Sequence, residues 1–196
     1  MSQVVSIRRV RIGARDGTFT PRRTVFCPRA NQSVHLEQCE PCPLRSGGDV
    51  ALDHVSITCT TDPTEAPRAV GSLVLGPLTC IDAAMPFAAL RTMRLDQVLT
   101  AVVEGDHARY VGCIRPSVFG VALELPPRVR AALLDSARVG DVMLATVPIA
   151  EGVTLLEAAG VMNRARARHL PVIATDGSVA GLLDDVTLLI GVSQSR

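Results

Sequence analysis

An internal repeat constrains the fold of this chain more than any other feature of its sequence. A shift of 69 residues places Val70-Gly71 on Val139-Gly140, and Met93 on Met162. Each copy has a β-like leading run, an amphipathic helical stretch, two short strands around a turn, and a closing helix. Repeats of this size usually stack and bury a shared face. We therefore expect two α/β units, over residues 69–125 and 139–196, joined by a linking helix over 126–138.

The second copy carries the clearest local signals. Thr154 followed by Glu157 is a capping-box pattern, which predicts the start of a helix. The runs HLPVIAT and SVAGLL are typical of strands, and Asp176-Gly177 between them is typical of a tight turn. Helical spacing predicts one buried stripe, formed by Leu155, Leu156, Ala158, Ala159 and Met162.

These strings resemble the CBS (cystathionine β-synthase) domain. The resemblance rests on VGDVM, VPIAEGVTLLEAAGVM and RHLPVIATDGSVAGLLDDVTLL in the second copy, and on VGSLVLGPLTCIDAAMPFAALRTM and VLTAVVEGDHARYVGCI in the first. It implies a CBS pair, or Bateman module: two β-α-β-β-α units packed with pseudo-twofold symmetry, frequently as a homodimer. Such pairs sense ligands, often adenine nucleotides, and regulate an attached or separate effector.

The chain departs from the motif that holds the ligand in this family, Gly-x-x-Thr/Ser-x-x-Asp. Asp184 stands at the Thr position and Thr187 at the Asp position, while the first copy has Arg115 and Val118 there. Asp184 either caps a helix or contacts a ligand, and Arg115 either binds an anion or is a surface residue. A carboxylate at a helix start disfavours phosphate, so an adenosine-like or uncharged ligand is expected rather than AMP or ATP. The resemblance also places beside the pocket Arg168, His169 and Pro171.

Residues 1–60 differ in composition from the repeat. Seven of the first 30 residues are Arg, against the single acid Asp16, and four of the six cysteines lie between positions 27 and 59. The runs VVSIRRVRI, TVFC and HVSITC predict strands. Residues 61–68, interrupted by Pro63 and Pro67, are expected to form a linker. We expect a small β-rich module whose arginines form a solvated basic surface.

Four cysteines of this module have the spacing C-x11-C-x2-C-x16-C: Cys27, Cys39, Cys42 and Cys59. One Cys-x-x-Cys lets two thiolates grip one ion from a tight turn, and two further thiolates complete a tetrahedron. The segment is similar to zinc-ribbon-like segments, which favours a structural Zn²⁺. An iron–sulfur or redox site, or unliganded thiols, remain open alternatives. His35 and His54 lie nearby in sequence, whereas Cys80 and Cys113 are expected as small buried hydrophobes.

The composition excludes several functions. All 20 basic residues are Arg, so chemistry that needs a Lys is absent. The sequence has no Gly-x-Ser-x-Gly, no His-Glu-x-x-His and no P-loop, so we expect no enzyme. Aromatic residues make up only 3%, which argues against a carbohydrate cleft or a base-stacking platform. The start lacks the pattern of a signal peptide, and apolar runs are too short for a membrane helix, so a cytoplasmic protein is expected.

The leading hypothesis is a regulatory sensor, in which a zinc-stabilised module precedes a CBS pair that binds an adenine nucleotide or nucleoside and regulates a protein partner. A homodimer is expected through the apolar faces of helices around 86–94 and 154–163. One alternative is a nucleic-acid-binding or transcription-linked protein that uses the Arg-rich module, although no binding tighter than micromolar is expected. Another is a ligand-free dimerisation scaffold. His107 is expected in an exposed turn.

Overall fold

The structure is a computed structural model that describes residues 2–13, 18–39, 41–43, 45–47, 56–60, 69–73, 75–93, 98–105 and 108–193. The expected linker 61–68, His54 and His107 lie outside these residues. The described part is a mixed α/β fold with two sheets, one of eight strands and one of three. No helix within the described ranges has the length and apolar character needed to cross a bilayer.

The N-terminal segment is β-rich, as predicted. It contains β1 (Ser2–Gly13), β2 (Phe19–Cys27), β3 (Gln32–His35), the short helix α1 (Leu36–Cys39), β4 (Arg45–Gly47) and β5 (Ser56–Thr60). β1 is the centre of this segment, because it pairs antiparallel with β2 and, through its first residues, with β5.

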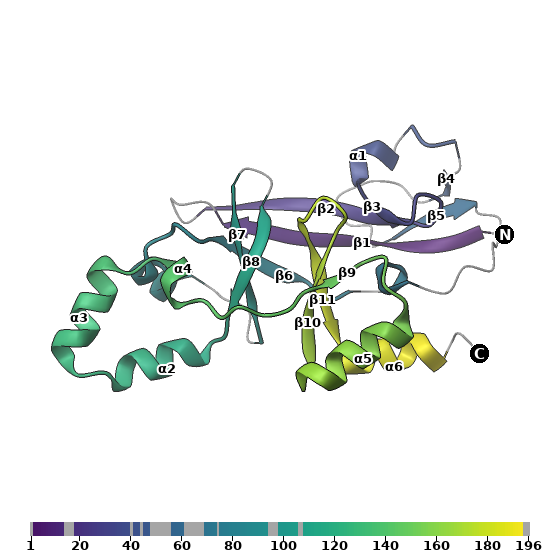
Figure 1. Ribbon diagram of the computed structural model, residues 1–196. Helices are drawn as coiled ribbons and strands as arrows, with labels where there is room; N and C mark the ends of the chain where they lie inside the picture. The colour runs from purple at the N-terminus through teal and green to yellow at the C-terminus, as the bar shows by residue number, and fades with distance from the viewer. Residues whose placement is uncertain are drawn as a thin grey trace.

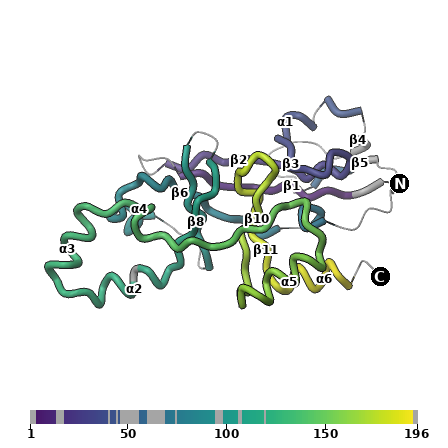
Figure 2. The backbone as a smooth tube through the Cα atoms, in the orientation of Figure 1, coloured from purple at the N-terminus to yellow at the C-terminus, as the bar shows by residue number. Residues whose placement is uncertain are grey.

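The repeat follows in the predicted order. Unit 1 contains η1 (Val70–Ser72), β6 (Leu78–Asp82), η2 (Phe87–Thr92), β7 (Thr100–Glu104), β8 (Arg109–Ile114) and α2 (Ser117–Glu124). The helix α3 (Pro127–Ser136) links it to unit 2, which contains α4 (Val139–Val142), β9 (Ile149–Ala150), α5 (Leu155–Ala165), β10 (His169–Ile173), β11 (Val179–Asp184) and α6 (Asp185–Ser193). Figure 2 shows α2 and α3 at one end of the molecule, away from α5 and α6.

The local signals of unit 2 are confirmed. The N–H of Glu157 donates to the hydroxyl of Thr154 at 3.3 Å, and the Glu157 carboxylate accepts from the Thr154 N–H at 3.0 Å. Leu155, Ala158 and Met162 are buried, but Leu156 is 82% exposed, so its place in the buried stripe was wrong. A helix turns by about 100° per residue, which carries Leu156 away from the face of its neighbour Leu155.

The expected helix around 86–94 is instead the short 3₁₀ helix η2. Its hydrogen bonds run from Ala89 N–H to the Pro86 carbonyl and from Met93 N–H to the Leu90 carbonyl, a separation of three residues. This copy lacks the Thr-x-x-Glu box that starts α5, and no side chain caps its first turn. Without that cap the segment forms only short, tight turns.

The N-terminal segment shares a sheet with unit 1. β1 pairs in parallel with β6, from Val10 opposite Leu78 to Gly13 opposite Ile81. The sheet therefore continues β3-β2-β1-β6-β7-β8 without a break. In Figure 1, β1 and β2 run past the strands of both units. The segment predicted as a separate module is thus one layer of the whole fold.

The two units exchange their leading segments. Gly76, before unit 1's first strand, bridges to Leu182 on β11, and Leu144, before unit 2's first strand, bridges to Cys113 on β8. A second pair of bridges joins Ala69 to Thr154 and Pro86 to Arg138. The core follows the exchange, because Val70 and Leu75 pack with unit 2 while Val139 packs with unit 1. Cys80 and Cys113 are fully buried, as predicted.

Candidate functional site

The β1-β2-β3 sheet has two faces with different chemistry. Side chains directly opposite one another in a sheet point to the same side. Ile7, Val25 and Val34 form one such row, and they pack with Leu36 and Ile57 in a small core. The next row along consists of Arg8, Thr24 and His35. The first face carries the cysteines, and the second lies against unit 2.

The structure brings the four predicted cysteines to one cavity of about 30 Å³. Cys27 ends β2, Cys39 ends α1 and Cys59 lies on β5. Cys42 is held by a turn in which its N–H donates to the Cys39 carbonyl at 3.2 Å. The four cysteines named from their spacing therefore line one cavity, and their role as metal ligands stays a prediction.

The environment of these thiols favours their protonated form. Burial, and then repulsion by Cys27, Cys59 and Cys42, raises the pKa of Cys39 to about 11. Burial also raises the pKa of Cys59, while the Arg45 guanidinium acts in the opposite direction on both groups. All six cysteines are described, and none forms a disulfide.

The cysteine positions do not form a closed ligand set. In the described part of the chain, no group of three or more His, Cys, Asp or Glu side chains is placed so that it could hold a metal ion. The donor set is nonetheless all thiol, and the cavity that these residues line has the volume of a single small ion or water molecule. Ligation would therefore require the cysteine side chains to turn into the cavity and lose their protons.

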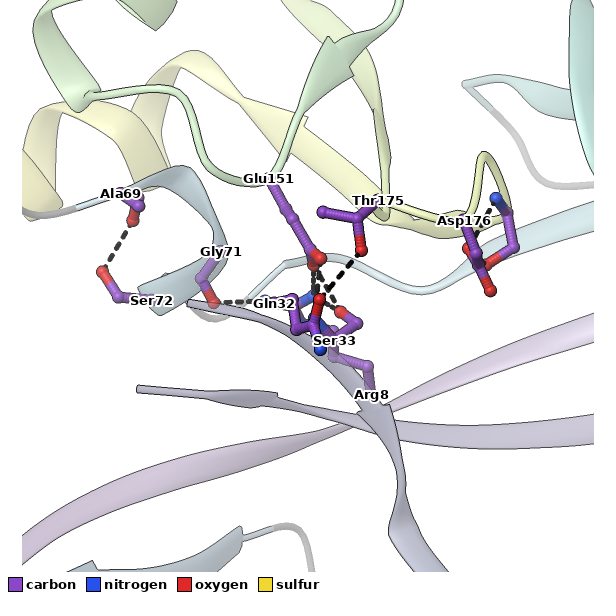
Figure 3. A network of polar contacts seen from close by, with 10 residues as sticks. Arg8, Gln32, Ser33, Ala69, Gly71, Ser72, Glu151, Thr175 and Asp176 are labelled. Carbon is purple, nitrogen blue, oxygen red and sulfur yellow. Dashed lines mark hydrogen bonds and ion pairs between the residues drawn. The ribbon is translucent and has the colours of Figure 1, made fainter. Parts of the chain in front are cut away.

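The second face of the sheet holds a buried ion pair that the sequence analysis did not find. Glu151 is 0% exposed and Arg8 is 5% exposed, and Arg8 Nη1 lies 3.3 Å from Glu151 Oε2. The N–H of Ser33 donates to Glu151 Oε1 at 2.6 Å, and the Ser33 hydroxyl donates to Oε2. Arg8 also donates to the Gly71 carbonyl (Figure 3). Its guanidinium lies over the Phe26 ring, 5.6 Å from the ring centroid. This network fastens the N-terminal sheet to unit 2.

The expectation of a solvated arginine surface is wrong for Arg8, which is buried, whereas Arg9 and Arg11 are exposed. Burial lowers the pKa of Arg8, and the adjacent Glu151 carboxylate opposes that shift. Arg11 donates to Thr79 at 2.8 Å and lies over Phe19, and Arg22 pairs with Asp176 at 3.4 Å. The sequence did hold a signal for the burial of Arg8. Arg8, Val10 and Ile12 are two positions apart, so their side chains point to the same face of β1.

The swapped motif forms a helix cap. Asp184 precedes α6, and its carboxylate accepts from the Thr187 N–H at 2.7 Å and from the Thr187 hydroxyl at 2.9 Å. Arg168 lies 3.3 Å from Asp185 and is 83% exposed at its side chain. His169 pairs with Asp184 across β10 and β11, and Pro171 is buried on β10. These residues gather on the β10-β11 hairpin, whereas Arg115 is exposed before α2 in unit 1.

Solved structures of CBS-pair proteins resemble the chain. CBSX2 from Arabidopsis thaliana is 20% identical with a TM-score of 0.47, over 66% of this chain and 96% of that one. The cytosolic domain of the Mg²⁺ channel MgtE, in complex with ATP, is 18% identical with a TM-score of 0.48, over 64% of this chain and 48% of that one. Hypoxic Response Protein I, with two coordinated zinc ions, is 17% identical with a TM-score of 0.45, over 61% and 94%. No protein-family model and no curated protein sequence matches.

Proposed function

We propose that this chain is a non-catalytic regulatory protein built on a CBS pair. The observation that carries the proposal is the exchange between the two units. Each unit has a strand, a helix, two antiparallel strands and a closing helix in the same order, and each leading segment bridges to the other unit. The reciprocity of the Gly76–Leu182 and Leu144–Cys113 bridges supports pseudo-twofold packing of the pair.

The proposed ligand of unit 2 is an adenosine-type nucleoside that regulates a protein partner through this pair. Asp184 keeps a carboxylate at the start of α6, where a helix otherwise attracts phosphate. A negative charge there disfavours AMP and ATP, while a ribose hydroxyl is a good donor to a carboxylate. The residues of this site would be Asp184, Thr187, Arg168, His169 and Pro171, with Arg115 as an anion contact in unit 1.

Titration calorimetry with adenosine, AMP and ATP tests this proposal. Adenosine should bind more tightly than either nucleotide. Asp184→Asn should weaken adenosine binding and reduce the difference in affinity between adenosine and the two nucleotides. Asp135→Asn on α3 is the matched control, because it removes an exposed carboxylate outside this site. A low-micromolar ATP affinity that Asp184→Asn leaves unchanged would exclude this ligand preference, and the absence of binding by all three compounds would favour a scaffold without a ligand.

We also propose that the N-terminal layer holds a structural Zn²⁺ through Cys27, Cys39, Cys42 and Cys59. Their common cavity and the all-thiol donor set support this proposal. Burial raises the pKa of Cys39 and of Cys59, and the Arg45 guanidinium opposes that rise, so metal binding would have to displace their protons. The lack of a disulfide among the six cysteines, all of which the structure describes, also supports a cytoplasmic location, where thiols stay reduced.

The nucleic-acid alternative receives less support. Arg8 is buried in its pair with Glu151, and Arg22 pairs with Asp176, so these two arginines are poorly placed to neutralise phosphates. We expect no nanomolar binding to DNA or RNA at physiological salt.

A further inference from the structure

A second cavity lies on the seam between the N-terminal sheet and unit 2. It has a volume of about 280 Å³ and is lined by β2, β3 and α1 on one side and by the turn between β10 and β11 on the other. Known small-molecule sites begin at about 300 Å³, so this cavity suits a ligand the size of a small metabolite. It is separate from the Asp184 site, because none of the residues proposed there lines it.

The wall of the cavity contains an unsatisfied buried hydroxyl. Thr24 is 7% exposed, and its Oγ1 has no hydrogen-bond partner among the described residues. Buried hydroxyls are normally paired, because an unpaired one loses its bonds to water without replacement. A polar ligand seated against Thr24 supplies the missing partner.

An ion pair between β2 and the β10-β11 turn lines the cavity. Arg22 Nη2 lies 3.4 Å from Asp176 Oδ2 and 3.0 Å from His35 Nε2. Because a guanidinium only donates, His35 Nε2 is the acceptor in this contact. Burial disfavours the Asp176 charge, but the hydrogen bonds from Ser178, together with Arg22, lower its pKa overall. The cavity therefore carries one cation and one anion at neutral pH.

This pattern selects against ligands of a single charge. An anion bound to Arg22 is repelled by the Asp176 carboxylate, and a cation bound to Asp176 is repelled by the Arg22 guanidinium. A molecule with both charges satisfies both side chains by charge-assisted hydrogen bonds, which are stronger than neutral ones. Figure 3 shows Thr175 and Asp176 of the turn facing β3, where Thr175 donates to Gln32 at 3.4 Å.

We propose that this cavity binds a small zwitterion of the free α-amino acid class, with its carboxylate on Arg22 and its ammonium group on Asp176. The Arg22–Asp176 pair opens to admit it, and Thr24 and Gln32 bind its remaining polar atoms. The bound molecule bridges the N-terminal sheet and unit 2. It lies beside Ser33, which also holds Glu151, so it stabilises the docking of the two parts.

Thermal shift and calorimetry with the full chain test the proposal. The probes are the twenty L-amino acids, together with ethanolamine and 3-hydroxypropionate, which are serine without its carboxylate and without its amine. At least one amino acid should bind, and the two single-charge analogues should not. Arg22→Gln and Asp176→Asn should each weaken that binding by about tenfold to a hundredfold.

Arg23→Gln is the matched control, because Arg23 follows Arg22 on β2, points to the other face and does not line the cavity. It should leave amino acid binding unchanged. The proposal is overturned if no amino acid binds, if either analogue binds as well as its parent, or if Arg22→Gln and Asp176→Asn change nothing. Adenosine binding at Asp184 should be the same in all these variants. Failure of the amino acid proposal can therefore be distinguished from failure of the proposed function.

Discussion

Glu151 depends entirely on residues that are distant in the sequence. Its carboxylate is buried and accepts from Arg8 and Ser33, which are 143 and 118 positions away. A buried charge without partners costs several kcal/mol, and a pair offsets that cost only when its other hydrogen bonds are also made. Here Ser33 and the Gly71 carbonyl complete the network around both charges. At the scale of single residues, this pair is what holds unit 2 against β1.

Glu151→Gln removes one charge of the pair and keeps the shape of the side chain. Arg8 then stays buried without a counterion, so we expect a loss of about 3–5 kcal/mol in the free energy of unfolding, measured by urea denaturation. The control is Glu37→Gln, since the Glu37 side chain is 71% exposed, and it should change stability by about 0.5 kcal/mol or less. Equal effects from the two variants would contradict the role given to Glu151.

Elements with strong local signals were predictable, and those defined by distant contacts were not. The start of α5 follows from Thr154 and Glu157, and the turn at Asp176-Gly177 fixes the β10-β11 hairpin. The parallel pairing of β1 with β6 has no local signature, because its partners are joined by a long connection. The four cysteines that line one cavity could be named from their spacing. The burial of Arg8 was indicated only by its place on the same face of β1 as Val10 and Ile12, against which its charge argued.

The short helix η1 depends on a glycine at its centre. A Cβ placed on Gly71 would lie 2.2 Å from the ring of Phe26, on which Arg8 rests. Gly71→Ala therefore has to displace the ring and should destabilise the fold by about 1–3 kcal/mol.

Gly120→Ala on α2 is the comparison, because its Cβ meets nothing within 4 Å. Replacing a helical glycine without a clash should stabilise the protein by about 0.4–1 kcal/mol. Thermal or urea unfolding measures both changes. Similar effects in the two variants would mean that the contact between Phe26 and Gly71 contributes little.

The whole molecule leaves an apolar surface on its C-terminal helices. The expected dimer face around 86–94 is covered, because Phe87 and Leu90 are buried. Large apolar side chains remain more than half exposed on α5 and α6, namely Leu156, Val186, Leu189 and Ile190. Exposed apolar side chains of this kind are typical of an association surface, so we expect the homodimer to form through α5 and α6.

Light scattering should give twice the 20.8 kDa mass of one chain. Leu156→Glu with Leu189→Glu should restore the mass of one chain, because two charges would be buried in the interface. Val121→Glu on α2, another exposed apolar position, should leave the dimer intact. A wild-type mass of 20.8 kDa at high concentration would rule out this dimer.

Zinc in the N-terminal layer would stabilise the part of the sheet that carries the cysteine cavity. Metal binding supplies about 10–16 kcal/mol in small zinc-binding peptides, and the core around Val25 and Ile57 is small. Cys39→Ser should loosen β5 and α1 in hydrogen exchange, because both lie at the cysteine cavity. β6 and β7 should remain protected, because β6 pairs with the other end of β1 and β7 follows β6 in the sheet.

Elemental analysis of the gently purified full chain measures the cysteine site most directly. We predict about one zinc per chain in the wild type and the loss of that zinc in Cys39→Ser. Cys80→Ser is the control, because Cys80 lies outside the cavity, and it should keep the zinc. Less than a tenth of a zinc per wild-type chain, or iron in place of zinc, would contradict the structural zinc site.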